Sequence, residues 1–497
     1  MKTLKIYGPP GTGKTHRLLG LFEEELKTTP PERIGFVTFT RQARLEALRR
    51  TGKTEDELPY VKTLHAICYK LLGLRHENLV QRDNLVKFGR AIGAPLTGYM
   101  PDVLSLESMT EAIRQPTKAD RLLQLNHLGR HRGMSLREAL RDAPTDLDFA
   151  YSKWFTESYR AWKTEEGLLD YTDILTQYLD AGPALSADVL FVDEAQDLSW
   201  LQWKVVHKLG GSVRRRYLAG DDDQAIFIWA GASADMFNTE PADEIEILPQ
   251  SYRIARAIHD TAHKIINRVR VRQAKEFRPR EEPGLYQQVG YLDPQWLEHG
   301  STYALFRNYH RGIAMASALE ELGIPFHSTQ HGVLGTPAVA KSLSGWLKVA
   351  KGDHVEADEA RAMVDMSVDG NLQGGARERV RNLRGAIPPT AIFNQDALHK
   401  SWSALLPRLP KMGYIERVTA RYGWNAVIKP NVRLLSIHQS KGGEADTVVL
   451  DMELARRTYD AYMTNPDDEH RVFYVAVTRA RDRLFTLMPT GPMCYQI

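Results

Sequence analysis

A phosphate-binding loop near the N-terminus constrains the fold of this chain more than any other feature. Residues 4–7 predict a short strand, which leads directly into Gly-Pro-Pro-Gly-Thr-Gly-Lys-Thr at residues 8–15 and then into a helical stretch. In a strand–loop–helix of this pattern, backbone N–H groups surround phosphates at the helix N-terminus. We therefore expect Lys14 to reach the β- and γ-phosphates of a nucleotide and Thr15 to hold Mg²⁺. The alternative, a glycine turn followed by a solvated lysine, does not explain the complete motif.

A second acidic element supports this interpretation. Residues 189–192 are continuously apolar, as in a buried parallel strand, and Asp193 and Glu194 follow them. Carboxylates at the C-terminal end of such a strand face the ligand crevice of an open α/β sheet. We expect Asp193 to bind Mg²⁺ and Glu194 to orient and deprotonate an attacking water. An acidic strand cap is the structural alternative.

Length and composition limit the number of domains and the class of protein. A chain of 497 residues with 43% hydrophobic and 26% charged residues predicts a protein of two to four domains. Sixty-five basic and 62 acidic residues leave nucleic-acid binding to be argued locally. The two cysteines form no disulfide or metal pattern, and no signal peptide or membrane span is evident. We expect a protein of the cytoplasm, in a bacterial or phage-infected cell.

The stretch AGDDDQAIFIWAGA at residues 219–232 combines two chemistries. Gln224 can hydrogen-bond a phosphate or its attacking water, and Phe227 and Trp229 can stack on bases. A motor that couples nucleotide hydrolysis to movement along a strand needs both. The two aromatic residues could instead be core residues, although positions i and i+2 share a face only in a strand.

The C-terminal hundred residues carry a second set of motifs. Strands are expected at 432–437 and 446–451, with His-Gln-Ser-Lys-Gly-Gly-Glu at 438–444 between them. Residues 471–481 have the period of a helix, whose C-terminal arginines could simply complement the helix dipole. Two other basic stretches are open to interpretation. Residues 214–216 predict a solvated run, and residues 268–280 either bind DNA backbone or form a polar connection.

Nine segments, taken in order, resemble the characteristic motifs of superfamily 1 DNA helicases of the UvrD/Rep branch. They span residues 8–481, almost the whole chain, and this makes the resemblance specific. The segments are GPPGTGKT, TFTRQA, TLHA, LDYTDIL, VDEAQD, AGDDDQAIFIWAGA, LPQSYR, LSIHQSKGGEAD and VFYVAVTRAR.

The resemblance implies an α/β fold with two RecA-like parallel-sheet ATPase core domains, each carrying a mostly helical insertion, with ATP between the cores. The spacing of motifs fits, since about 180 residues separate the phosphate loop from the acidic strand. We expect the first core at 1–80 and 170–250, its helical insertion at 81–169, the second core at 251–330 and 431–497, and a shortened insertion at 331–430.

The resemblance also assigns roles. Gln224 would sense the γ-phosphate, Tyr252 would stack on adenine, and Arg253 and Arg479 would be arginine fingers of the second core domain. Glu444 would bind the ribose. The expected catalytic residues are Glu194, Lys14, Gln224, Arg253 and Arg479. The expected nucleotide-binding residues are Gly8, Pro9, Pro10, Gly11, Thr12, Gly13, Lys14, Thr15, His16, Tyr252, Arg253, Gly442, Glu444 and Arg479, and the Mg²⁺ ligands are Thr15 and Asp193. The expected single-strand track is Thr40, Arg41, Thr63, His65, Phe227, Trp229 and His438.

Some of these residues could have a purely structural role instead, and at other positions the sequence departs from the family. Tyr252 could be ordinary packing, and His438 could be satisfied locally. Leu64 and Ala230 stand where the family has a phenylalanine and an arginine, respectively, so we expect the contacts with DNA to be distributed over other residues. Only seven residues precede the phosphate loop, and we expect weaker discrimination of ATP from GTP without the family's upstream glutamine. The short C-terminus leads us to expect no fused nuclease, and the trimmed ends are in keeping with a compact phage member.

The sequence predicts an ATP- and Mg²⁺-dependent DNA helicase or single-strand translocase, and the resemblance to the UvrD/Rep branch implies that it moves 3′→5′. Its partners would be single-stranded DNA, single/double-strand junctions and proteins of DNA replication or repair, and the chain would act as a monomer. Two alternatives are a translocase that strips proteins from DNA with little unwinding, and a phosphate-loop ATPase that acts on protein partners. RNA as the track is a weaker variant, since no element is seen to read a 2′-hydroxyl.

Overall fold

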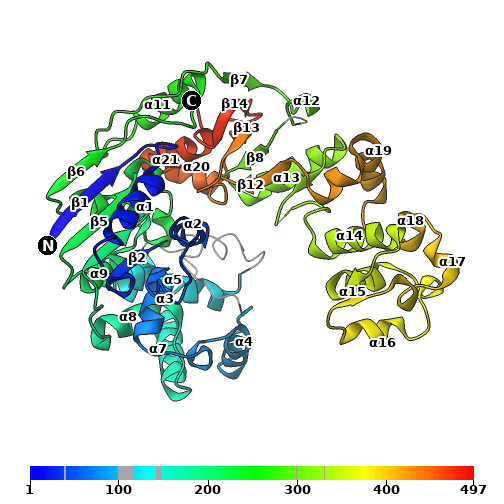
Figure 1. Ribbon diagram of the computed structural model, residues 1–497, viewed down its shortest axis with the longest axis horizontal. Coiled ribbons are helices and arrows are strands. Elements are labelled where there is room, and N and C mark those ends of the chain that lie inside the picture. The colour runs from blue at the N-terminus through cyan, green and yellow to red at the C-terminus, as the bar shows by residue number, and fades with distance from the viewer. Residues whose placement is uncertain (39–40, 99–115, 142–146, 298–299, 330) are drawn as a thin grey trace. The chain divides into compact units, whose positions relative to one another are not determined.

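Two six-stranded parallel sheets organise the chain in the computed structural model, which describes residues 1–38, 41–98, 116–141, 147–297, 300–329 and 331–497. One sheet belongs to a unit formed by Met1–Pro283 and Asn465–Val475. The other belongs to a unit formed by Gly284–Thr464 and Ala476–Ile497. The predicted fold class, two parallel-sheet α/β units with many helices, is confirmed (Figure 1).

The first sheet has the strand order β3-β2-β4-β5-β1-β6, and every neighbouring pair is parallel. Its central strands β4 and β5 read almost entirely as buried residues, as expected for a sheet that is covered on both faces. The strands are β1 (Lys2–Tyr7), β2 (Ile34–Val37), β3 (Val61–Lys62), β4 (Val189–Val192), β5 (Arg215–Gly220) and β6 (Glu244–Ile247).

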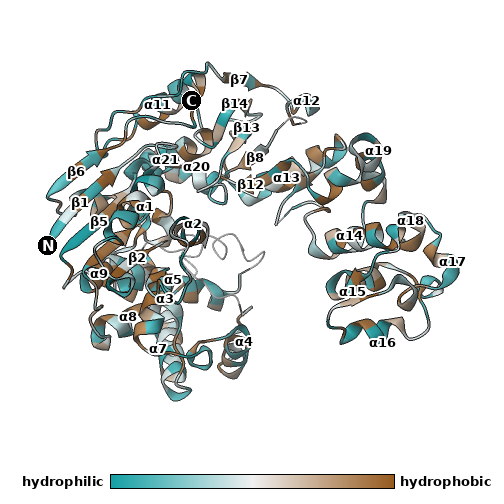
Figure 2. Cartoon of the chain, viewed as in Figure 1, coloured by the Kyte–Doolittle hydropathy of each residue, from teal (hydrophilic) through white to brown (hydrophobic). Residues whose placement is uncertain are grey.

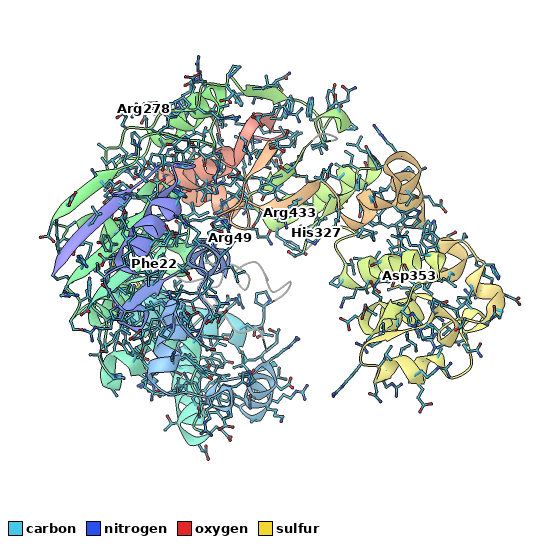
Figure 3. All side chains as sticks on the ribbon, viewed as in Figure 1. Phe22, Arg49, Arg278, His327, Asp353 and Arg433 are labelled. Carbon is cyan, nitrogen blue, oxygen red and sulfur yellow. The ribbon has the colours of Figure 1, made fainter. Side chains whose placement is uncertain are left out.

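Side chains alternate between two apolar cores on the faces of this sheet. Phe36 and Phe191 stack at 5.4 Å, and Phe22 of α1 (Lys14–Glu25) meets both edge-on on that face (Figure 3). Leu190 and Val192 of β4 point to the other face. That second core is closed by α3 (Leu64–Leu71), α8 (Tyr171–Ala181) and α9 (Trp200–Leu209), whereas α2 (Arg41–Thr51) joins α1.

The described part of the first predicted insertion is mostly helical. Its helices α4 (Arg82–Ala91), α5 (Lys118–Arg132), α6 (Leu136–Arg141) and α7 (Phe149–Glu165) surround their own aromatic core around Phe88 and Tyr159. Asp170 then caps the N-terminus of α8, whose residues Ile174, Leu175 and Tyr178 lie in the second core of the sheet. The unit also includes α10 (Ala234–Thr239) and α11 (Arg256–Ile266).

The second sheet has the order β7-β14-β13-β8-β12-β9, again with only parallel pairs. Helices α12 (Pro294–Leu297) and α13 (Tyr309–Glu321) pack on one face of it. On the neighbouring strands β9 and β12, His327 and Arg433 are register partners (Figure 3). The strands are β7 (Leu285–Val289), β8 (Thr302–Phe306), β9 (Phe326–His327), β12 (Val432–Ser436), β13 (Ala445–Asp451) and β14 (Ala480–Leu487).

The second predicted insertion forms its own apolar cluster. Its larger helices are α14 (Pro337–Lys351), α15 (Ala357–Met366), α16 (Ala376–Arg381) and α19 (Met412–Ile428), with short helices α17 (Gln395–Leu398) and α18 (Trp402–Leu405). Strands β10 (Val355–Glu356) and β11 (Ala386–Ile387) pair antiparallel. Brown and teal residues alternate along α13 and α19 in Figure 2, as in helices that bury one side.

Three sequence expectations differ from the structure. The compact units divide between Pro283 and Gly284 rather than at residue 250, so residues 251–283 lie with the phosphate loop. Helix α20 (Arg456–Thr464) precedes α21 (Pro466–Val477), which ends before Arg481, and this arginine lies in β14 instead of at a helix terminus. Of the arginine run at 214–216, Arg214 is exposed as predicted, whereas Arg216 in β5 is 4% exposed and pairs with Glu240 at 2.5 Å, so the prediction of a solvated run is wrong for Arg216.

Candidate nucleotide site

The candidate site lies where three adjacent strands of the first sheet end. In the order β4-β5-β1, the strands are followed by Asp193, Asp221 and Gly8, respectively. Parallel register aligns their carboxyl ends, since Tyr7 pairs with Gly220. The topology therefore brings together the three motifs that the sequence singled out, at the edge of an open α/β sheet where ligands bind.

Glycines shape the phosphate loop in ways that other residues cannot. Gly11 and Gly13 have φ angles of 76° and 82°, in the left-handed region, and Gly13 caps the N-terminus of α1. A Cβ atom on Gly8 would lie 2.4 Å from the Thr12 hydroxyl. That hydroxyl donates to the carbonyl oxygen of Pro9 at 2.8 Å, which closes the loop on itself. The loop ends at the N-terminus of α1, whose free N–H groups and dipole favour anions.

Lys14 and Thr15 begin α1 and face the acidic strand end. The Lys14 ammonium donates to the carbonyl oxygen of Gly8 at 2.5 Å, folding back over the loop. The Thr15 hydroxyl donates to Asp193 Oδ2 at 3.0 Å. Burial, and secondly the adjacent Glu194 carboxylate, raise the pKa of Asp193 to about 7. A buried carboxylate beside a hydroxyl offers the hard oxygen ligands that suit Mg²⁺, and a bound cation would favour the ionised form of Asp193.

Glu194 occupies a strained backbone position immediately after β4. Its φ and ψ are 50° and 40°, a left-handed conformation that costs a residue other than glycine free energy and that gathers at functional sites. Gln196 fixes the Glu194 side chain, since its amide donates to the Glu194 carboxylate at 2.6 Å. The side-chain oxygen of Gln196, Oε1, accepts from the backbone N–H of Asp221 at 3.0 Å. Gly220 permits this approach, because a Cβ there would lie 2.7 Å from that oxygen.

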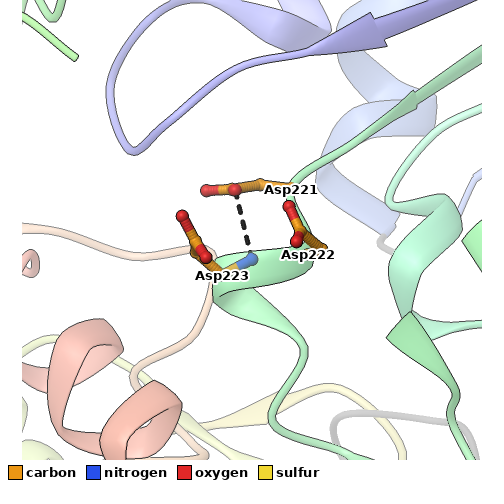
Figure 4. A group of neighbouring side chains, drawn as sticks. All are labelled: Asp221, Asp222 and Asp223. Atoms are coloured by element: carbon orange, nitrogen blue, oxygen red, sulfur yellow. Dashed lines mark hydrogen bonds between the residues drawn. The ribbon is translucent and has the colours of Figure 1, made fainter. Parts of the chain in front are cut away.

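The acidic segment after β5 is held by a buried lysine that the sequence analysis did not single out. The carboxylates of Asp221, Asp222 and Asp223 lie within 4.8 Å of one another (Figure 4). The ammonium of Lys275 contacts all three, at 3.0 Å from Asp221 and from Asp223 and at a shorter distance from Asp222. Asp221 also accepts from the side-chain amide of Gln224 at 2.6 Å. Lys275 thus fills the place that a cation would take among these carboxylates.

Residues 251–253 lie against the phosphate loop. Ser251 Oγ donates to the carbonyl oxygen of Pro10 at 2.9 Å, and the backbone N–H of Tyr252 donates to that of Gly11 at 2.9 Å. A Cβ on Gly11 would lie 2.4 Å from Arg253 Cβ, so the close approach requires glycine. Arg253 was expected in the second core domain, but it belongs to the first compact unit. Tyr252 is 75% exposed, which leaves its ring open to stacking.

The predicted track residues of the first unit differ in exposure. Trp229 is 49% exposed, whereas Phe227 is 4% exposed, so the structure does not present the two rings together. Phe227 directly precedes a short helical turn at 228–230, and Trp229 is the middle residue of that turn, so the two rings do not lie on one strand. Thr63 caps α3 and is exposed, and His65 meets the Tyr171 ring edge-on at 6.0 Å. Thr40 and the Arg41 side chain lie outside the described residues.

His16, which was predicted to bind the nucleotide, is hydrogen-bonded to Arg50 of the first unit. His16 Nδ1 accepts a hydrogen bond from the Arg50 guanidinium at 3.3 Å, and the same guanidinium donates to the His16 carbonyl oxygen at 3.3 Å. Arg50 in turn pairs with Glu23 at 2.8 Å. The structure therefore gives His16 a role in joining α1 to α2.

The remaining predicted site residues lie in the second unit. Gly442 has a φ of 81°, and Glu444 pairs with Arg481 at 3.5 Å. The Arg479 guanidinium is 2% exposed and donates to the carbonyl oxygen of the residue before Glu444 at 3.0 Å. His438 follows β12 and is half-buried. Arg479 is thereby held beside the loop that was predicted to bind the ribose.

The fold and the site define an α/β protein with a phosphate-binding loop. Family comparison is in agreement. The UvrD/REP helicase N-terminal domain matches residues 1–244, and the UvrD-like helicase C-terminal domain matches residues 420–489. The chain belongs to the UvrD/REP helicase family.

Individual relatives are distant. DNA helicase II of Escherichia coli K12 is 24% identical over 354 residues, which cover 64% of this chain and 47% of that protein. ATP-dependent DNA helicase PcrA of Leuconostoc citreum is 26% identical over 329 residues, covering 61% and 42%. A probable DNA helicase II homolog of Mycoplasma pneumoniae is 23% identical over 598 residues, covering 97% and 81%. The chain spans 40–42% of the length of the first curated relatives it matches.

Among the helices of the described ranges, none has both the length and the apolar character needed to cross a bilayer.

Proposed function

We propose that this chain is an ATP-dependent DNA helicase that moves 3′→5′ along single-stranded DNA. The observation that carries the proposal is the convergence of Lys14, Thr15, Asp193 and Glu194 at one sheet edge, with the Thr15 hydroxyl 3.0 Å from Asp193. This arrangement supplies what hydrolysis of a nucleoside triphosphate needs, and membership of the UvrD/REP helicase family supports DNA as the track.

Each residue of the first unit has a defined task in this proposal. The phosphate loop and Lys14 bind and orient the β- and γ-phosphates, while Thr15 and Asp193 hold Mg²⁺. When bound, Mg²⁺ neutralises charge on the phosphate oxygens. Glu194, oriented by Gln196, accepts a proton from the attacking water. Gln224, fixed by Asp221, lies in the same hydrogen-bonded network and is suited to sense the γ-phosphate.

Arginines and the exposed aromatic residues complete the proposal. Arg253 and Arg479 stabilise the charge that develops on the transferring phosphoryl group, and Tyr252 stacks on the adenine ring. Trp229 is the residue of the 227–229 pair whose ring is open to a base. Base–aromatic stacking contributes roughly 1–3 kcal/mol per base, a scale comparable to separating one duplex step at about 1.4 kcal/mol. We propose that a single chain carries out the reaction, since both sets of motifs lie in it.

Strand displacement tests the proposal. Duplexes with a 3′ tail, a 5′ tail or no tail are incubated with ATP and Mg²⁺, and strand release is measured in parallel with phosphate release. We expect release from the 3′-tailed duplex and hydrolysis stimulated by single strands. Release only from the 5′-tailed duplex would refute the polarity. Stimulated hydrolysis without release would point to a translocase, and hydrolysis unaffected by DNA would refute a nucleic-acid track.

A further inference from the structure

Lys275 lies in the segment that follows α11, and its side chain is fully buried. Its three carboxylate partners are buried as well, being at most 1% exposed. Burying three negative charges side by side is costly unless cations and donors compensate them. Lys275 is the one cation that reaches all three in the part of the chain that the structure describes.

The three carboxylates differ in the other donors that compensate their negative charge. The Arg272 guanidinium pairs with Asp223 through two nitrogens, at 2.5 Å and 2.8 Å. Asp222 accepts from the backbone N–H of Gln273 at 2.7 Å and from the Asn238 amide at 3.1 Å. The Asp221 carboxylate accepts from the Gln224 amide at 2.6 Å and from the backbone N–H of Asp223 at 3.3 Å (Figure 4), and it forms an ion pair with Lys275 at 3.0 Å. Among the described residues, Lys275 is therefore the cation that pairs with Asp221, and Asp221 in turn holds the Gln224 amide.

The segment that carries Lys275 also supports the loop residues 251–253. The backbone N–H of Ser251 donates to the carbonyl oxygen of Arg278 at 2.8 Å, and Arg280 N–H donates to that of Ile254 at 2.9 Å (Figure 3 labels Arg278). Ser251 in turn donates to the phosphate loop. Residues 275–280, which we call the strap, thus join the Asp221–Gln224 segment at one end to the Tyr252–Arg253 segment at the other.

We propose that Lys275 is a positioning residue of the nucleotide site, which holds Asp221 as an ionised acceptor for the Gln224 amide and fixes the strap to it. This inference rests on the proposed hydrolysis of ATP. Lys275 does not touch the reacting atoms; it acts through Asp221 on Gln224, and through the backbone of Asp221 on Gln196 and Glu194.

Electrostatics gives the consequence of losing the ammonium. Burial alone raises the pKa of Asp221, but the attraction of Lys275, and then of Lys14, outweighs it and holds the pKa below its usual value. Without Lys275, burial and the neighbouring carboxylates would favour protonated Asp221, a weaker acceptor for Gln224. The charged or titratable groups around Asp221 are Lys14, Asp222, Asp223, Arg272, Lys275 and the Tyr7 hydroxyl.

The test compares Lys275→Met with Lys163→Met. Lys163 is a matched control because its buried ammonium also bridges carboxylates in the first unit, those of Asp170 and Asp173. Full-length variants are assayed for DNA-stimulated ATP hydrolysis as a function of ATP concentration and pH, with thermal unfolding measured on the same samples. Lys275→Arg tests conservative rescue. Lys275→Met combined with Asp222→Asn restores the net charge of the cluster. This double variant is expected to fold even if Lys275→Met alone does not.

We expect Lys275→Met to lower kcat roughly 10- to 100-fold, as for a misplaced catalytic group, with KM for ATP changed less than about threefold. Its activity should also need a higher pH than wild type, because Asp221 must first ionise. The double variant should recover part of kcat, and Lys163→Met should lose stability with kcat of the folded protein retained. Equal kcat losses in the two lysine variants, or an unshifted pH profile, would overturn the inference. A wild type without hydrolysis would refute the proposed function and this inference with it.

Discussion

The side-chain amide of Gln196 donates a hydrogen bond of 2.6 Å to the carboxylate of Glu194. Glu194 sits in the left-handed backbone region, so its side chain leaves β4 at an angle that ordinary strand geometry would not give. The other end of the Gln196 amide accepts from Asp221, at the end of the neighbouring strand β5. One glutamine therefore ties the proposed general base to the segment that carries Gln224.

Replacing Gln196 with alanine should slow hydrolysis without abolishing nucleotide binding. The Glu194 carboxylate would lose the donor that orients it, and misplacing a catalytic group costs about 100-fold in rate. We expect kcat for ATP to fall by about that factor, with KM little changed, in steady-state phosphate-release assays. Gln202→Ala is the control, since that amide caps α9 instead and its loss costs about 1 kcal/mol of stability. A comparable fall in kcat for Gln202→Ala would contradict the assignment.

Lys14→Ala should abolish hydrolysis and leave the fold intact. The ammonium contacts the loop through the Gly8 carbonyl oxygen, and half-exposed residues at a helix start tolerate alanine well. The expected result is background phosphate release with unchanged binding of a fluorescent single strand, measured by anisotropy. Loss of DNA binding together with a lowered melting temperature would show that the variant is misfolded instead.

Trp229→Ala should keep basal hydrolysis and lose most of its stimulation by single-stranded DNA. The ring is 49% exposed, and removing a base-stacking ring costs roughly 1–3 kcal/mol of binding. Trp154→Ala on α7 is the matched control, because that ring is 42% exposed and was assigned no contact with DNA. Stimulation curves against DNA concentration separate the two variants. Identical curves for Trp229→Ala and wild type would remove Trp229 from the track.

The parts of the site that follow from local pattern could be predicted from the sequence. The apolar run before Asp193 is β4 from Val189 to Val192, and the predicted strand–loop–helix around the phosphate loop is β1, residues 8–13 and α1. Lys275 could not be predicted, because its partner Asp222 lies 53 positions away and a lone lysine in a basic stretch has no local signal. The end of α21 at Val477 was missed for a related reason: residues 478–483 contain no glycine or proline that would mark the change from helix to strand β14.

Two buried histidines predict an acid-sensitive first unit. Burial lowers the pKa of His127 and, more strongly, of His131, whose Nδ1 atoms contact Thr172 at 2.6 Å and Ser199 at 2.9 Å, respectively. Above the unfolded pKa of about 6.5 neither state is charged, and below it the unfolded chain takes up protons that the folded protein does not. The free energy of unfolding should therefore fall by up to about 1.4 kcal/mol per pH unit for each histidine below pH 6.5.

Urea unfolding of wild type and His131→Gln at several pH values between 5 and 8 measures this dependence. The variant should be less stable at pH 8, because glutamine fits the site less well, yet its stability should vary less between pH 6.5 and 5. The same slope in both proteins would mean that His131 titrates in the folded state.

Phe227→Ala should act on stability, in contrast to Trp229→Ala. The Phe227 ring is 4% exposed, although sequence alone pairs it with Trp229 as a stacking platform. Removing a buried phenylalanine costs about 3–5 kcal/mol through lost burial and the cavity it leaves. We expect a lower midpoint of urea unfolding for Phe227→Ala, and recovery of most of the stability in Phe227→Leu, since leucine refills much of the volume. Because the Phe227 ring is buried and leucine keeps this position apolar, DNA stimulation per folded molecule should be retained in Phe227→Leu. A leucine variant with wild-type stability that has lost stimulation would instead place the Phe227 ring directly on the DNA.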